Sequence, residues 1–258
     1  MRFVNCGCGE KYIGSKEWIN IDFTRKENVI GHNLLKGLPL EGDSVDVVFS
    51  SCMLEHFSLE QARKFLAECY RVLVTDGICR IVVPDLENIC REYLNILEKV
   101  RVDRLNYDKQ YEYILIELID QMTRTCSGGE MLKYWNSDER DEDYILKRTG
   151  YPEKGEQRKL SIIKQLINYR ERILYCLFSK KKWFQARNLG RFMLSGEVHK
   201  WMYDSYGLQR LMEETGFRNI KVMLYNQSDI VEWEKWQLEV NHDGLEYKPN
   251  CLYMEGTK

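Results

Sequence analysis

Long apolar runs are missing from this chain of 258 residues. None approaches the roughly 18 consecutive residues needed to cross a bilayer, so no membrane-spanning helix is expected. Residues 1–5 enter a predicted strand at once, which leaves no room for a signal peptide. The formal net charge is only −2, so the molecule as a whole is not an electrostatic nucleic-acid binder. These absences predict a globular protein of the cytoplasm.

Paired cysteine motifs are also missing. The nine cysteines are scattered through apolar segments, which is typical of reduced thiols in a cytosolic protein. The one close pair, Cys6 and Cys8, has no histidine cluster or CxxC motif beside it, so it lacks the ligands of a metal site. The pair instead favours a tight turn around Gly7, and no metal site is predicted anywhere in the chain.

Short β-like runs alternate with turn or helix signals over the first 85 residues, as in βαβ units of a parallel sheet. The predicted strands are residues 3–5, 18–22, 29–30, 45–50 and 78–83. Between the last two strands, Ser58 and Gln61 form a capping box, and apolar residues at helical spacing follow. We expect Gly77 to end this helix.

The pattern then becomes helical and stays so until about residue 194. The predicted helices are residues 86–100, 105–126, a broken acidic stretch at 138–143, and 160–178. A helix over 205–215, ended by Gly216, precedes two strands at 219–224 and 251–255. This order predicts an α/β domain spanning residues 1–258, in which residues 86–198 form a helical insertion or lid.

Candidate ligand-binding residues follow three strands. Gly7 and Gly9 come after the first strand, where glycine lets the backbone approach a ligand closely. Asp22 ends the second strand, where a carboxylate can accept both hydroxyls of an adenosyl ribose. Asn33 and Leu34 follow the third. Each feature alone also fits a tight turn or a helix cap, but their conjunction at one sheet edge predicts an adenosyl site.

Successive segments resemble the motifs of class I S-adenosylmethionine-dependent methyltransferases. The segments are residues 4–9, 18–22, 38–40, 43–48, 54–57 and 72–77. Residues 46–57 are especially similar to the pattern D-x-V-x-x-x-x-x-L-E-H. Residues 199–204, 216–217 and 248–255 resemble a methyltransferase-11-like bacterial subgroup associated with surface polysaccharide synthesis. The resemblance covers roughly the first 90 and the last 60 residues.

The resemblance implies a Rossmann-like, seven-stranded methyltransferase sheet, mostly parallel with an antiparallel last strand, and S-adenosylmethionine as cofactor. Its implied cofactor-binding residues are Asn5, Gly7 and Gly9 at the methionine moiety, Asp22 at the ribose, Asn33 and Leu34 at the adenine, and Ser50 and Ser51, with Cys52 beside them, at the sulfonium. The family usually has Asp at the position of Asn33. An amide oxygen still offers an acceptor there.

Methyl transfer requires an aligned acceptor, and a hydroxyl acceptor also benefits from a general base. His56, His199 and Tyr203 are the candidate bases, because they fall just after the fourth strand and at the exit of the insertion. For His56 the alternative is structural, since Glu55 and His56 can simply organise the loop before the next helix. We predict methyl transfer to a small-molecule or saccharide acceptor at a hydroxyl oxygen.

Basic residues are concentrated in residues 158–191, where ten basic side chains and one acidic side chain give a net charge of +9. A solvated helix face would explain this segment. The sharper hypothesis is an anionic or lipid-linked glycan acceptor, or peripheral contact with a membrane leaflet. No recognisable nucleic-acid module accompanies the charge, so specific nucleic-acid binding is disfavoured. Aromatic residues of the preceding helices fit either a core or a homodimer face.

Two other functions remain open. A nicotinamide-dependent oxidoreductase needs G-x-G-x-x-G, but Tyr12 stands at the third glycine position. A catalytically silent protein that binds an adenosyl ligand would keep the same fold and glycine loop.

Overall fold

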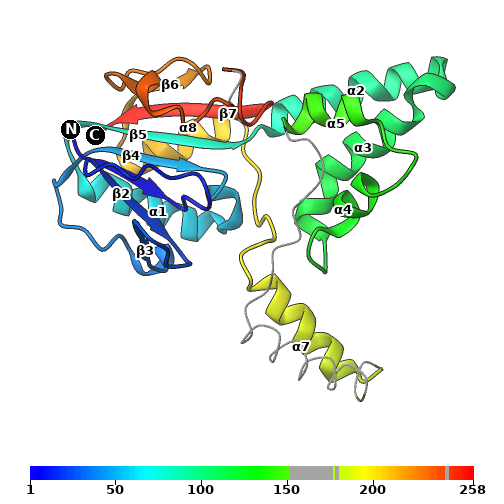
Figure 1. Cartoon of the computed structure of the whole chain (residues 1–258), viewed down its shortest axis with the longest axis horizontal. Helices are drawn as coiled ribbons and strands as arrows, with labels where there is room; N and C mark the ends of the chain where they lie inside the picture. The colour runs from blue at the N-terminus through cyan, green and yellow to red at the C-terminus, as the bar shows by residue number, and fades with distance from the viewer. Residues whose placement is uncertain (151–176, 178–179, 242–243) are drawn as a thin grey trace.

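Seven strands form one mixed sheet in the computed structural model, which describes residues 1–150, 177, 180–241 and 244–258 (Figure 1). The strand order is β3-β2-β1-β4-β5-β7-β6. The strands are β1 (Phe3–Cys6), β2 (Trp18–Asp22), β3 (Val29–Gly31), β4 (Val45–Ser51), β5 (Leu73–Pro84), β6 (Arg218–Met223) and β7 (Cys251–Thr257). Strands β1 to β5 pair in parallel, whereas β7 runs antiparallel between β5 and β6. The predicted Rossmann-like sheet of seven strands, mostly parallel with an antiparallel last strand, is confirmed.

The central strands are apolar on both sides because both faces of the sheet are covered. Helices α1 (Leu59–Val72) and α8 (Ser205–Thr215) pack on one face, where Val4, Val48 and Phe65 share one buried cluster. The other face is covered by the chain between β6 and β7, including the short helix η3 (Trp233–Trp236). The sheet is therefore a rigid platform that fixes the loops at its edge.

Helix α1 begins at the predicted capping box, but the prediction that Gly77 ends it is wrong. The helix ends at Val72, and Gly77 lies inside β5. A β-carbon on Gly77 would come within 2.9 Å of the Val74 carbonyl oxygen and 3.0 Å of the Asp46 carbonyl oxygen. The glycine therefore marks a close approach of two backbones in the sheet, not a helix end.

The helices between β5 and α8 lie off the sheet, most of them beyond one end of it (Figure 1). They are α2 (Leu86–Val102), α3 (Arg104–Thr123), α4 (Gly129–Trp135), α5 (Glu142–Thr149) and α7 (Lys182–Met193). Helices α2 to α5 have a buried cluster of their own, which includes Ile89, Tyr113 and Tyr144. Within the described residues, no helix is both long and apolar enough to span a membrane.

Two helix predictions in this region change. The acidic stretch 138–143 is not one helix: residues 136–139 form turns and a bend, and α5 begins only at Glu142, where the Asp141 side chain caps it. Helix α4 has no counterpart in the prediction. The predicted helix at 160–178 falls outside the described residues except for Leu177, and the bounds 86–198 of the insertion stay a prediction.

Candidate functional site

The loops after β1 and β2 meet at one edge of the sheet. Gly7 adopts a φ of +71°, and its N–H donates to the Ile21 carbonyl oxygen at 2.8 Å. The Gly9 N–H donates to the Asp22 carboxylate at 2.9 Å. A β-carbon on Gly7 would lie 2.5 Å from Cγ of Met53, so only glycine fits without displacing that side chain. The glycine loop and the carboxylate are thus adjacent, as the sequence predicted.

A cavity of about 460 Å³ opens beside this junction, and we call it the Asp22 cavity. It brings together predicted residues from three strand ends, namely Gly7, Asp22, Asn33 and Leu34, with the predicted base His56. Its other walls come from Met53 and from the segment leading out of α7, which contributes Leu194, Ser195, Gly196 and Lys200. Of the residues predicted after the first three strands, four therefore share one cavity, whereas Gly9 is not among its lining residues.

A second cavity of about 430 Å³ lies on the other side of the glycine loop, and we call it the Lys248 cavity. The predicted residues Asn5, Gly7, Gly9 and Ser51 line it, together with Lys11, Cys52 and Lys248. Gly7 and Cys52 line both cavities, so the two adjoin. Ser50 lies elsewhere: it is buried in β4 and is not among the lining residues of either cavity.

The polar side chains of the Asp22 cavity are already bonded to the chain. Asp22 accepts from Gly9 through one carboxylate oxygen and from the Thr24 N–H through the other, at 3.0 Å. The Asn33 amide oxygen accepts from the Leu35 N–H at 3.0 Å and caps η1 (Leu34–Lys36). These bonds hold both side chains in place, and each oxygen keeps a second lone pair for a ligand.

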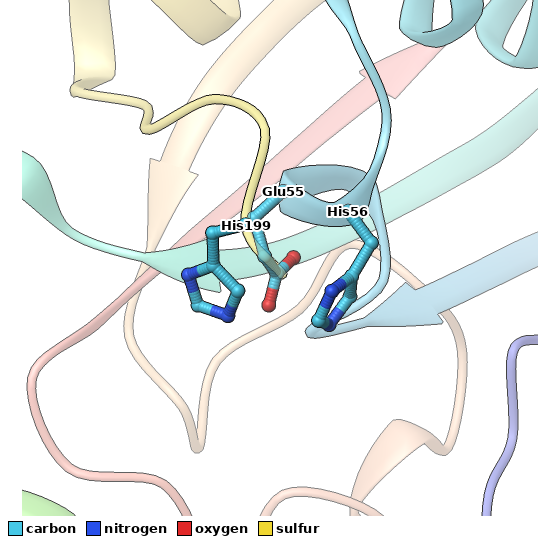
Figure 2. Close-up of side chains that lie close together, drawn as sticks. All are labelled: Glu55, His56 and His199. Atoms are coloured by element: carbon cyan, nitrogen blue, oxygen red, sulfur yellow. The ribbon is translucent and has the colours of Figure 1, made fainter. Parts of the chain in front are cut away.

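The three predicted bases gather around a buried glutamate. The His56 and His199 ring centroids are 4.8 Å apart, and the Glu55 carboxylate lies between the rings (Figure 2). Glu55 and His56 belong to the short helix η2 (Leu54–His56) after β4, whereas His199 comes from the segment before α8. Only His56 lines the Asp22 cavity; His199 and Tyr203 are buried behind it. The sequence had given Glu55 no chemical role.

Burial keeps the two histidines of this cluster in their neutral form. It lowers the pKa of His199 to about 3, with further lowering by His56 and Arg124, and it lowers the pKa of His56 as well. Burial also raises the pKa of Glu55. Both imidazoles are therefore neutral near pH 7 and can accept a proton or bind a cation. His199 is the weaker base of the two, because its charged form is so unfavourable.

Three lysines contribute to the site without having been predicted. Lys200 lines the Asp22 cavity, and Lys11 and Lys248 line the Lys248 cavity. The Lys248 ammonium donates to the Ser51 hydroxyl at 3.3 Å. The pKa of Cys52 is lowered mainly by a hydrogen bond from Cys251 and also by the charge of Lys248. The one feature of the sequence that singled out the region of Lys248 was the resemblance of residues 248–255 to the polysaccharide subgroup.

The basic segment 158–191 is only partly described. Its residues 158–176 lie outside the described part of the chain, while Lys180, Lys181 and Lys182 are exposed at the start of α7. Trp183 beside them is 56% exposed. The choice between a solvated face and an anionic contact stays a prediction.

Comparison with known proteins agrees with the methyltransferase resemblance. Residues 16–81 match a family described as a methyltransferase domain, which covers β2 to the middle of β5. No curated protein sequence matches the chain. The match supports the predicted S-adenosylmethionine-dependent class for this segment, and it contains Asp22, Asn33, Leu34 and His56.

Solved structures of similar fold cover the whole chain at low identity. One is a SAM-dependent methyltransferase from Archaeoglobus fulgidus, with 14% identity, a TM-score of 0.41 and 86% of its own length covered. A second, a possible histamine N-methyltransferase from Thermotoga maritima, has 12% identity, a TM-score of 0.43 and 82% of its length covered. A third, from Mesorhizobium loti, has 12% identity, a TM-score of 0.42 and 90% covered.

Proposed function

We propose that this chain is an S-adenosylmethionine-dependent methyltransferase that methylates a hydroxyl oxygen of a small-molecule or saccharide acceptor. The observation that carries the proposal is the Asp22 cavity. A carboxylate at the end of β2, a glycine loop after β1 and an apolar rim at Leu34 surround one space of about 460 Å³. These are the groups that an adenosyl ligand needs at the edge of a parallel sheet.

The residues present fit this cofactor. Asp22 would accept from the ribose hydroxyls, and Asn33 and Leu34 would flank the adenine. Gly7 and Cys52 line both cavities, so the sulfur would lie where the two cavities adjoin. The amino-acid end would then reach the Lys248 cavity, where the Lys11 ammonium offers a partner for its carboxylate.

The bound cofactor supplies an electrophilic methyl group on a leaving group that is already activated. The chain has to align the acceptor, exclude water and remove the hydroxyl proton. His56 is the predicted base that lines the Asp22 cavity and is neutral near pH 7. His199 and Tyr203 would act behind it by positioning Glu55 and His56.

The finer identity of the acceptor rests on the sequence. The saccharide class and a role in polysaccharide synthesis come from the motifs at residues 199–204 and 248–255. Anionic or lipid-linked character is favoured by Lys200 at the cavity and by the basic segment, which would also supply any peripheral membrane contact. A cytoplasmic location is proposed from the scattered cysteines, and a homodimer from the aromatic residues of the helices that precede the basic segment.

Nicotinamide chemistry is disfavoured by the loop after β1. Residues 7–17, all within the described part of the chain, form no helix. A dinucleotide pyrophosphate normally rests on a helix N-terminus at that position, and a sulfonium cofactor needs none. A silent adenosyl-binding protein is the remaining alternative, because binding residues alone do not prove turnover.

Isothermal titration with S-adenosylmethionine, its demethylated product S-adenosylhomocysteine and NAD tests the proposal. We expect both adenosyl ligands to bind and NAD to give no heat. Incubation with a panel of sugars and sugar nucleotides, followed by mass spectrometry, would then detect methylated product. Binding without turnover on any hydroxyl or amine acceptor would favour the silent protein, and preferential binding of NAD would overturn the assignment.

A further inference from the structure

Three side chains with metal-binding donor atoms meet beside the Asp22 cavity. One carboxylate oxygen of Glu55 and one ring nitrogen each of His56 and His199 lie within 4.8 Å of one another. Figure 2 shows the carboxylate between the two imidazole rings. A cation placed among them would have three ligands of the types that bind transition metals.

The cluster is held in place by backbone bonds. The Lys200 N–H donates to the Glu55 carbonyl oxygen at 2.7 Å, which ties the segment carrying His199 to η2. The His199 N–H in turn donates to the Gln121 carbonyl oxygen of α3 at 3.0 Å. The donor atoms therefore face one another because three separate parts of the fold are fixed together, as a preformed site requires.

One atom of Glu55 and one atom of His56 are buried without a hydrogen-bond partner in the described part of the chain, although each side chain makes another bond elsewhere. Glu55 is 1% exposed, and its Oε2 has no hydrogen-bond partner among the described residues. The same holds for Nδ1 of His56. Leaving a buried polar group unsatisfied costs about 1–3 kcal/mol, and more for a charged one. Such groups need an explanation, and a bound cation would provide one for both.

We propose that Glu55, His56 and His199 bind a divalent transition metal such as Zn²⁺. Two imidazoles and one carboxylate form the donor set of catalytic zinc sites, which leave a further coordination position open. Imidazole ligands select against Mg²⁺ and Ca²⁺, which prefer oxygen. The sequence predicted no metal site because His199 lies far along the chain from Glu55 and His56, and only the fold brings the three together.

The charges around the cluster also bear on a cation. The Arg124 guanidinium forms ion pairs with the carboxylates of Asp120, at 2.6 Å, and Glu197, at 3.5 Å. These two carboxylates offset its positive charge. Lys200 and Lys248 remain as positive charges near His56. They weaken cation binding, and this sets the expected affinity below that of a structural zinc site.

The position of the site links it to methyl transfer, and this step rests on the proposed function. His56 lines the Asp22 cavity, so the open coordination position would face bound acceptor. With His56 coordinated, the metal ion takes over the role of the free imidazole base, because a metal ion lowers the pKa of a hydroxyl that reaches it. The hydroxyl proton would pass to solvent, the oxygen would bond to the methyl carbon, and the carbon–sulfur bond would break to release the demethylated cofactor.

Metal titration of the full chain, without cofactor or acceptor, tests the site. After removal of metals with a chelator, we expect one equivalent of Zn²⁺ or Co²⁺ to bind. The Co²⁺ spectrum should show visible bands and lack the near-ultraviolet thiolate band, because the ligands are nitrogen and oxygen. Glu55→Gln and His199→Gln should each weaken binding at least tenfold, whereas His32→Gln, at a histidine outside the cluster, should leave it unchanged.

Several outcomes would overturn the site. They are no bound cation in the natural protein, unchanged binding in both variants, or a thiolate band, which would place the metal on cysteine sulfur instead. Thermal unfolding and S-adenosylhomocysteine titration of the variants show that they still fold. Failure of the natural protein to bind S-adenosylhomocysteine would contradict the proposed function and leave the metal result intact.

Discussion

Asp22 bonds to the chain through both carboxylate oxygens and would also hold the ribose of the cofactor. We expect Asp22→Ala to weaken S-adenosylhomocysteine binding by about 1–3 kcal/mol, because the ribose hydroxyls and the Gly9 N–H all lose their acceptor. Isothermal titration measures this. Glu60→Ala, at an exposed carboxylate on α1, is the control and should bind normally. Unchanged affinity in Asp22→Ala would remove the ribose role.

Lys11 provides a pH-dependent readout of the second cavity. Burial, with a smaller effect of the Lys248 charge, lowers the pKa of Lys11 to about 8. The ammonium is therefore charged below pH 8 and neutral above it, so its attraction for the cofactor carboxylate is lost as the pH rises through 8. We expect affinity for S-adenosylhomocysteine to fall over this range by about 1 kcal/mol, roughly fivefold.

Lys11→Met separates this effect from titration of the ligand. The amine of S-adenosylhomocysteine titrates equally with both proteins, so only the difference between their pH profiles belongs to Lys11. We expect the variant to bind more weakly at pH 7 and as well as the natural protein at pH 9.5. Parallel profiles in titrations from pH 6.5 to pH 9.5 would show that Lys11 does not contact the cofactor.

Among individual residues, the sequence could predict the site residues that directly follow a strand of the sheet. Gly7, Asp22 and Asn33 could be placed together because parallel strands end at one edge of a sheet. Lys11 and Lys248 could not, since they belong to irregular segments whose paths depend on tertiary packing. His56 and His199 were each nominated separately, but nothing in the spacing indicated that Glu55 would lie between them.

The ion pair of Arg80 joins β5 to the segment that covers one face of the sheet. Its guanidinium donates to Glu239 at 2.7 Å and to Glu255 at 2.6 Å, with all three side chains buried. We expect Arg80→Met to lower the free energy of unfolding by about 3–5 kcal/mol, because two buried carboxylates lose their counter-ion. Urea denaturation followed by circular dichroism measures the change.

The exposed pair of α2 supplies the matched control. Arg91 donates to Glu87 at 2.6 Å on the helix surface, where Arg91→Met should cost less than about 1 kcal/mol. A similar loss in both variants would mean that the Arg80 cluster contributes no more than a solvated pair.

The elements themselves were predicted best where local signals agree. The capping box at Ser58 placed the start of α1 because two side-chain bonds close it locally. The end of α1 was misplaced because glycine ends helices and also permits close strand packing, and residues 73–77 alone do not distinguish the two. Residues 73–77 form a strand because β5 pairs with β4, which is distant in the sequence.

On the scale of the whole molecule, the sheet and the helices α2 to α5 have separate buried clusters. Residues 197–200 connect them near the site. Glu197 accepts from the Gly128 N–H at 2.8 Å before α4, and Lys200 donates to the Glu55 carbonyl oxygen after β4. The same stretch of chain, from Leu194 to Lys200, supplies one wall of the Asp22 cavity. Ligand binding at the sheet edge should therefore also slow exchange in residues 194–200, which connect the sheet to the helices.

Hydrogen–deuterium exchange with and without S-adenosylhomocysteine tests this connection. We expect slower exchange in residues 7–11, 22–24 and 33–35, which surround the glycine loop and Asp22, and also in residues 194–200, because a ligand that fills the cavity closes both walls to solvent. Residues 86–102 of α2 serve as the internal control and should exchange at the same rate, since they line neither cavity. Protection confined to the loops after β1 and β2 would mean that the ligand lies on the sheet edge alone. Residues 194–200 would then take part in binding the acceptor at most, and not the cofactor.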